Sequence, residues 1–146
     1  MANTSAMCTS FKQEILVATH NFTASTGNTF KIALYDSDAT LGASTTAYSS
    51  SEEITNTSGT AYTAGGATLT SVTPTTSGTT AFCDFAPDIS LTSASFTANA
   101  ALIYNSSASN KAVAAIAFGG DKTVTNGTFT IQFPTADASD AIIRIA

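Results

Sequence analysis

An acidic pair that follows the first apolar strand offers the clearest chemistry in this sequence. Asp36 and Asp38 are separated by one residue, Thr40 follows them, and the apolar run Ile32 to Tyr35 precedes them. An aspartate at the end of a buried strand can act as a nucleophile toward a phosphoryl group, and paired carboxylates suit Mg²⁺. Mg²⁺-dependent phosphoryl transfer is therefore the first activity to weigh.

The segment resembles the D-x-D-x-T nucleophile loop of haloacid dehalogenase-like phosphatases. The family's further active-site residues, a lysine and then aspartates, also occur here in that order: Lys111 or Lys122 is followed by Asp137 and Asp140. That chemistry needs a parallel sheet with crossover helices, which bring the strand ends together. Because almost no helix-forming sequence separates the strands, we expect a polar turn that ends a strand. The pair also lacks the Gly and Glu of a complete calcium loop.

Two further candidates also favour structural roles. His20 is the only histidine, so no second imidazole exists to complete a His-based metal site. We expect it to contact the last carbonyls of a helix. The run Gly119 to Thr123 lacks the spacing of a phosphate-binding loop and is predicted to be a turn. We therefore predict no catalytic, cofactor-binding or metal-binding residue and no enzymatic activity.

Three tyrosines could bind a sugar if their rings were exposed together. These are Tyr48, Tyr62 and Tyr104, and the chain has no Trp, which is the best stacking residue. Tyrosines in strands usually cover the edge of a core while their hydroxyls reach water. Glycan binding is therefore kept only as an alternative.

The two cysteines, Cys8 and Cys83, are expected to be free and buried or half-buried thiols. The sequence leaves open whether they meet. The first ten residues show neither a basic nor an apolar leader region, so we expect no secretory route and no glycan. The asparagines of the Asn-x-Ser/Thr motifs are then expected to be turn and surface residues. Four of these asparagines are Asn21, Asn56, Asn105 and Asn126.

Composition points to a β-rich protein with a nearly uncharged surface. Thr and Ser supply 45 of the 146 residues, whereas charged residues supply only 10%. Thr is β-branched and suits a strand that faces water through its hydroxyl. The five Lys and Arg form no cluster and the net charge is −5, so nucleic-acid binding is not expected. No window approaches the ~20 apolar residues that cross a bilayer, so no membrane partner is expected.

The hydrophobic pattern predicts one helix followed by strands. A helical stripe begins after Ser10 and runs through Phe11, Ile15, Ala18 and Phe22, and Ser10 with Gln13 forms a predicted capping box. Residues 42–66 are expected to be an ordered excursion anchored by Tyr48, Ile54 and Tyr62. Strands are predicted at 30–35, 68–73 before Pro74, 79–85, 96–104, 111–118, 129–133 after an Asn126-Gly127 turn, and 142–145.

Short strands at regular spacing, without a βαβ rhythm, predict an all-β antiparallel fold of the β-sandwich or jelly-roll type with one short N-terminal helix. Residues 10–146 are expected to form a single domain. Residues 1–9 are expected to form a flexible arm that orders on a neighbour.

Three stretches carry a resemblance to a known group of proteins. They are SFKQEILVATHNFTASTGNTFKIALYDSDATLG (10–42), AYTAGGATLT (61–70) and NKAVAAIAFGGDKTVTNGTFTIQFPTADASDAIIRI (110–145). Together they resemble small β-rich virion structural proteins of tailed bacteriophages, of the capsid decoration or cement type.

The resemblance implies a non-enzymatic protein that bridges subunits of the major capsid protein on the phage head. It implies a homo-oligomer, with a trimer favoured, that is made in the host cytoplasm and ends in the virion. It assigns no contact residue. A tail or fibre component that binds host glycans is the alternative that the residues leave open.

Overall fold

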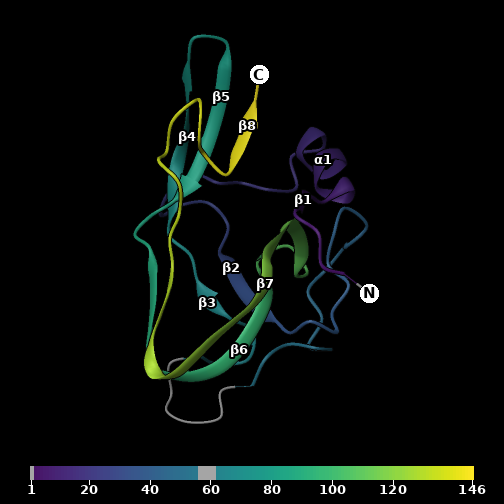
Figure 1. Cartoon of the computed structure of the whole chain (residues 1–146). Coiled ribbons are helices and arrows are strands. Elements are labelled where there is room, and N and C mark those ends of the chain that lie inside the picture. The colour runs from purple at the N-terminus through teal and green to yellow at the C-terminus, as the bar shows by residue number, and fades with distance from the viewer. Residues whose placement is uncertain (1, 56–61) are drawn as a thin grey trace.

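Two antiparallel sheets and one short helix make up the computed structural model, which describes residues 2–55 and 62–146 (Figure 1). This confirms the predicted mostly-β class with a short N-terminal helix. The elements are β1 Ala6–Met7, α1 Thr9–Leu16, β2 Phe30–Tyr35, β3 Ala67–Thr68, β4 Ser71–Ser77, β5 Thr80–Phe85, β6 Ile89–Asn105, β7 Lys111–Ile131 and β8 Ile143–Ile145.

The larger sheet has the strand order β1-β7-β6-β2-β3. β2 occupies the residues that the sequence predicted, but Ile32, Ala33 and Leu34 are all buried. Both faces of this strand are covered, which explains why it reads as a nearly continuous apolar run. β2 is antiparallel to both of its neighbours, β3 and β6. The strand that precedes Asp36 therefore does not belong to a parallel sheet.

A long, sharply bent ribbon of β6 and β7 dominates the larger sheet (Figure 1). The predicted hairpin of 96–104 with 111–118 is confirmed, but both strands continue well beyond it. The turns predicted at Gly119-Gly120 and Asn126-Gly127 are wrong, because β7 runs through both. The register with β6 shifts near each site, and Gly119, Gly120 and Asn126 have positive φ angles of 74°, 140° and 46°. These residues bend the ribbon as β-bulges rather than ending a strand.

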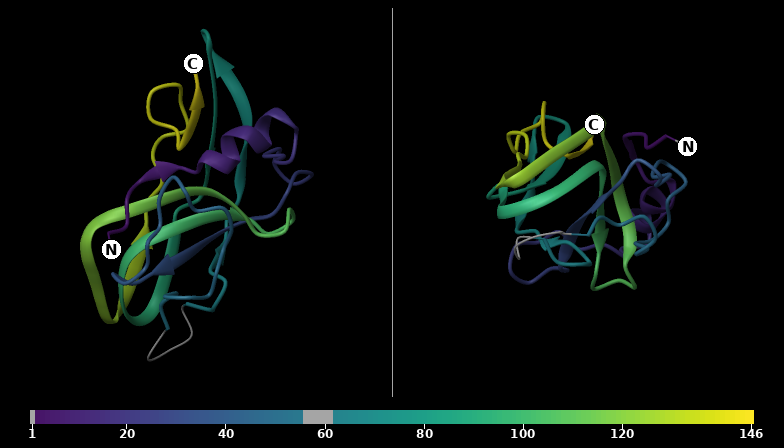
Figure 2. Two further views of the ribbon diagram at one scale, coloured as in Figure 1. Left: turned by 90° about the vertical axis from the view of Figure 1, so that its right-hand side faces the viewer. Right: turned by 60° about the horizontal axis from the view of Figure 1, so that its bottom comes forward.

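The smaller sheet has the order β4-β5-β8, and its β4–β5 hairpin reaches beyond the larger sheet (Figures 1 and 2). The predicted strand over 68–73 is wrong, because β3 ends at Thr68 and β4 begins at Ser71 and passes through Pro74. The register with β5 shifts between Val72 and Thr75, at Pro74. β4 is an edge strand, where a residue without an N–H group is tolerated.

The predicted helix exists but is shorter than its apolar stripe, because it ends at Leu16. Ala18 takes the left-handed φ of 59° that commonly ends helices, and its N–H donates to the Ile15 carbonyl. The predicted capping box is wrong: Cys8 is the N-cap, no side chain caps the helix, and Ser10 Oγ is buried without a partner. Among the described residues, no helix is long and apolar enough to span a membrane.

The segment expected to be an arm contacts the domain over most of its described length. Ala6 and Met7 pair with Ala115 and Ala114 of β7, and Cys8 is fully buried. The Thr4 N–H also donates to the Leu41 carbonyl at 2.9 Å. Ala6 and Met7 therefore add an edge strand to the larger sheet, and Thr9 already belongs to α1.

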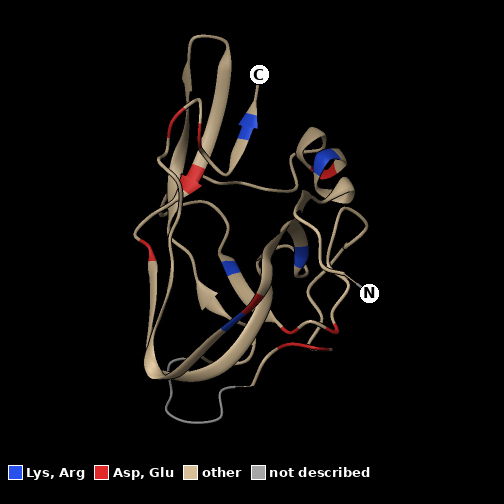
Figure 3. Ribbon diagram, viewed as in Figure 1, with Lys and Arg blue, Asp and Glu red and all other residues tan. Residues whose placement is uncertain are grey.

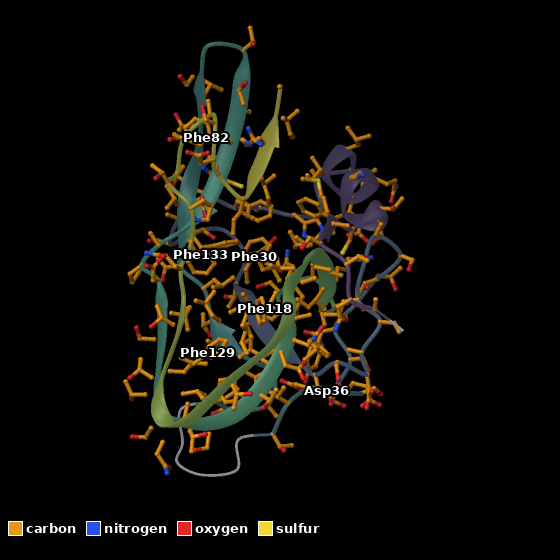
Figure 4. All side chains as sticks on the ribbon, in the orientation of Figure 1. Phe30, Asp36, Phe82, Phe118, Phe129 and Phe133 are labelled. Atoms are coloured by element: carbon orange, nitrogen blue, oxygen red, sulfur yellow. The ribbon has the colours of Figure 1, made fainter. Side chains whose placement is uncertain are left out.

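A row of aromatic rings joins the two sheets. Phe22 stacks on Phe30 with ring centroids 4.2 Å apart, Phe30 lies 5.9 Å from Phe85, and Phe85 lies 5.9 Å from Phe133. Figure 4 shows Phe30 and Phe133 between the sheets. Full burial of one such side chain contributes about 1.5–3 kcal/mol. This row fixes the spacing between the sheets and therefore the cavities along it.

Candidate functional site

The acidic pair singled out in the sequence lies on an exposed turn beside β2. Carboxylate oxygens of Asp36, Asp38 and Glu52 lie within 4.8 Å of one another (Figures 3 and 4). Asp36 Oδ1 accepts a hydrogen bond from the Asp38 N–H at 2.9 Å, which closes the local turn as the sequence predicted. Exposed acidic groups often gather without an ion, and no additional feature of the described residues points to one here.

Two further residues of the phosphatase order, Lys111 and Asp137, have partners elsewhere in the structure. Lys111 Nζ donates to Glu14 at 2.8 Å, and Asp137 Oδ1 accepts the N–H groups of Ser139 and Asp140 at 2.8 Å. The antiparallel β2 supplies no switch point at which a phosphate could sit. The geometry of the described residues therefore does not assemble this kind of active site.

His20 belongs to a buried polar network rather than to a helix end. Its side chain is fully buried, and Nε2 lies 2.8 Å from Glu14 Oε2. The Asn105 amide donates to His20 Nδ1 at 3.0 Å and to Asn28 Oδ1 at 2.9 Å. The predicted contact with helix carbonyls is therefore wrong. Since Nδ1 accepts from the amide, Nε2 carries the proton that is donated to Glu14.

Glu14 is the centre of this network, and no pattern in the sequence singled it out. Its side chain is 8% exposed and accepts hydrogen bonds from both Lys111 and His20. Burial on its own would raise the pKa of this carboxyl group, but the two hydrogen bonds and the nearby positive charge lower it. Glu14 is therefore a paired carboxylate that joins α1 to β7.

The asparagines Asn21, Asn56, Asn105 and Asn126, each in an Asn-x-Ser/Thr motif, differ in their surroundings. Asn21 is exposed and its Oδ1 accepts the Thr23 N–H at 3.0 Å, as expected for a turn residue. Asn126 is exposed in a bulge of β7. Asn105 is a turn residue, because its Oδ1 accepts the Ser107 N–H at 3.0 Å, but it is not a surface residue, because it is fully buried in the His20 network. Asn56 lies outside the described residues.

All four tyrosines gather around Glu53 in the long excursion. Tyr48 donates to Glu53 Oε2 and Tyr62 to Oε1, each at 2.6 Å, and the Tyr62 hydroxyl also accepts the Leu34 N–H at 2.9 Å. Tyr104 stacks on Tyr48 with ring centroids 4.7 Å apart. The fourth tyrosine, Tyr35, donates to the Ser49 carbonyl at 2.6 Å. Tyr62 thus anchors the excursion to β2, as does Ile54, whose N–H donates to the Leu34 carbonyl at 3.0 Å, while Tyr48 anchors it to β6 through Tyr104. All three anchors predicted from the sequence are confirmed, and residues 56–61 lie outside the described part.

The tyrosine cluster does not provide a platform for sugars. Tyr62 and Tyr104 are only 6% and 3% exposed. Burial, together with the Glu53 carboxylate, raises the pKa of the Tyr48 and Tyr62 hydroxyls, which stay neutral donors. The chemistry of this cluster is therefore internal and structural.

Cys8 and Cys83 are free and buried, as predicted. Burial raises the pKa of the Cys8 thiol to about 11 and of the Cys83 thiol to about 12. Reactive cysteines need a low pKa and access to solvent. Neither thiol is a nucleophile in this structure.

Three large apolar side chains are exposed at the end of α1 and on β8, and together we call them the adhesion face. It consists of Leu16, Val17 and Ile145, which are 85%, 61% and 54% exposed. A small cavity of about 140 Å³ separates α1 from β8 and is lined by Ile15, Ile143 and Ile145. The periodicity of the sequence does not single out these three residues, because Leu16 and Val17 lie at the end of the helix and Ile145 comes from the other end of the chain.

Comparison with known proteins found no match: no protein-family model, no curated protein and no solved structure matches the chain. The function is therefore argued from the residues and the fold.

Proposed function

We propose that this chain is a non-enzymatic structural protein of a tailed-phage virion, which decorates the head and cements neighbouring subunits of the major capsid protein. Sequence stretches over residues 10–42 and 110–145 support it through their resemblance to such proteins. In this proposal the chain acts as a homo-oligomer, with a trimer favoured, on the head surface after synthesis in the host cytoplasm.

The observation that carries the proposal is the adhesion face within a surface that holds few charges. Apart from the acidic group of Asp36, Asp38 and Glu52, Figure 3 shows the charged residues spread over the ribbon, and the chain has only five basic and ten acidic side chains. β4 adds a row of exposed Thr and Ser side chains. Burying apolar and hydroxyl groups against a partner avoids the cost of desolvating unpaired charges. Such contacts also depend little on salt.

Stabilisation of the shell by a bound protein is a consequence of mass action. A protein that binds only the assembled shell stabilises that shell, and an oligomer that contacts several subunits gains from avidity. A contact made by the adhesion face would be repeated at each copy of the oligomer. Small contributions per copy would then sum to a large resistance against the pressure of packaged DNA.

Virions that carry or lack this protein test the proposal. We expect particles without it to release DNA at a lower temperature, and added purified protein to restore the wild-type release temperature. A Leu16→Ser/Val17→Ser variant should restore the release temperature poorly. The control is Lys12→Gln, which changes another exposed residue of the same helix and should restore the release temperature fully.

Cryo-electron microscopy of the same virions locates the protein. Density at junctions between capsid subunits would support the proposal, and density confined to the tail would reject it in favour of a tail or fibre role. Equal heat resistance of particles with and without the protein would also contradict it.

A further inference from the structure

An apolar cavity of about 630 Å³ lies inside the bend of the β6–β7 ribbon. Ile32, Ala101 and Ile116 line it from three strands of the larger sheet. Phe118 and Phe129, whose ring centroids are 6.3 Å apart, line it from β7. Figure 4 labels both rings together with Phe133, which lines it from the segment after β7.

The size and lining of this cavity are those of a ligand site. Pockets of about 300–1,000 Å³ with mainly hydrophobic walls and few polar groups hold drug-sized ligands. The bulges at Gly119-Gly120 and near Asn126 bend the ribbon around the cavity, so the space follows from the backbone of β7. A recess of this volume suits the apolar part of a small ligand.

Among the residues that the structure describes, Lys122 is the only charged one that lines the cavity. It is exposed, and within residues 2–55 and 62–146 the ion pairs are those of Glu14 with His20 and Lys111. An exposed lysine beside an apolar recess can hold its charged end in water while its stem follows the apolar wall. A ligand with an anionic head and an apolar body would match both features.

We propose that this cavity binds a long-chain monocarboxylate, with the alkyl chain against Ile116, Phe118 and Phe129 and the carboxylate paired with Lys122. A neutral alkane would leave the lysine unpaired, and an alkyl ammonium would be repelled by it. The inference does not depend on the role in the virion, because it rests on the lining residues and on one positive charge.

Calorimetric titration of the purified protein with dodecanoate, below its micelle concentration, tests the site. We expect one molecule bound per chain. Lys122→Gln should weaken dodecanoate binding roughly fivefold, the effect of one exposed ion pair. The same variant should bind dodecan-1-ol as the wild type does. Lys12→Gln, which removes a lysine from α1, should change neither affinity.

A variant that fills the cavity completes the test. Ile116 is half-buried, so Ile116→Trp adds bulk to the recess and should weaken both ligands at least tenfold. Its melting curve shows whether it folds, and if it does not, Lys122→Gln decides the outcome.

Three results would overturn the proposal. They are the absence of saturable dodecanoate binding, equal dodecanoate affinity of wild type and Lys122→Gln, and dissociation of an oligomer by Ile116→Trp in sedimentation velocity. The last result would assign the cavity to a contact between copies of the chain.

Discussion

Two carboxylates, the buried Glu14 and the half-buried Glu53, each contact several side chains that lie far apart in the sequence. Glu14 joins the helix to Lys111, which lies 97 residues further along the chain. Glu53 accepts hydrogen bonds from the hydroxyls of Tyr48 and Tyr62 and from the Gly65 N–H. A buried charge is tolerated only when it is paired and hydrogen-bonded. These residues therefore hold the fold together rather than perform chemistry.

Replacing Glu14 by Gln should lower stability in a pH-dependent way. The loss of the charge-assisted hydrogen bonds should cost about 1–3 kcal/mol at pH 7. Since the folded pKa of Glu14 lies below its ordinary value of 4.5, its contribution is fully present above pH 4.5 and is lost as the pH falls through the folded pKa. Urea unfolding of wild type and variant from pH 7 to pH 3 measures this difference.

The exposed Glu52 gives the control, because Glu52→Gln should change stability little at any pH. A stability difference between wild type and Glu14→Gln that stays constant down to pH 3 would contradict the assignment of the lowered pKa.

Tyr62→Phe should destabilise the fold more than Tyr48→Phe. Both variants lose a hydrogen bond to Glu53, but only Tyr62→Phe also leaves the buried Leu34 N–H without this partner. An unsatisfied buried donor costs about 1–3 kcal/mol. Chemical denaturation of the two variants makes the comparison, and an equal or larger loss for Tyr48→Phe would show that the Leu34 contact contributes nothing.

At the scale of elements, β-bulges and close backbone approaches shape the larger sheet. Gly66 precedes β3 with φ +81°, and a Cβ there would lie 2.1 Å from the Ile32 carbonyl oxygen of β2. Since that oxygen belongs to a paired strand, it cannot move away without disturbing the sheet. The glycine is required where the excursion returns to β2.

Gly66→Ala should therefore lower the melting temperature much more than Gly78→Ala. Gly78 also has a positive φ, +58°, but nothing lies within 4 Å of its would-be Cβ. Its variant should cost only the roughly 1–2 kcal/mol of a left-handed backbone. Thermal unfolding followed by circular dichroism compares the two, and similar melting temperatures would mean that β3 and β2 separate easily.

Element types were predictable where the local pattern is strong. Alternation or continuous apolar runs located β2, β5 and the β6–β7 hairpin, and the helix was located by its stripe. Gly119-Gly120 and Asn126-Gly127 were misassigned as turns because the same residues serve turns and bulges. Only the pairing of β7 with β6 distinguishes the two outcomes, and this pairing involves residues far apart in sequence.

At the scale of the whole molecule, the two sheets create surfaces that no single element holds. The adhesion face combines the end of α1 with β8, and the 630 Å³ cavity combines β2, β6, β7 and Ile142. The first is an outward surface of the kind that marks protein contacts. The second is a recess suited to a small ligand. The two proposed roles therefore use separate parts of the molecule.

Composition and local periodicity by themselves determined the β class, the single short helix, the sparse charge and several strands, because backbone preferences and solvent exposure act over a few residues. Only the tertiary structure decided that Glu14, His20 and Asn105 meet in the interior, that the tyrosines turn inward, and that β7 bends around a cavity. The physical reason is that burying a polar group or bending a strand depends on partners supplied by remote segments, whose positions a linear pattern does not encode.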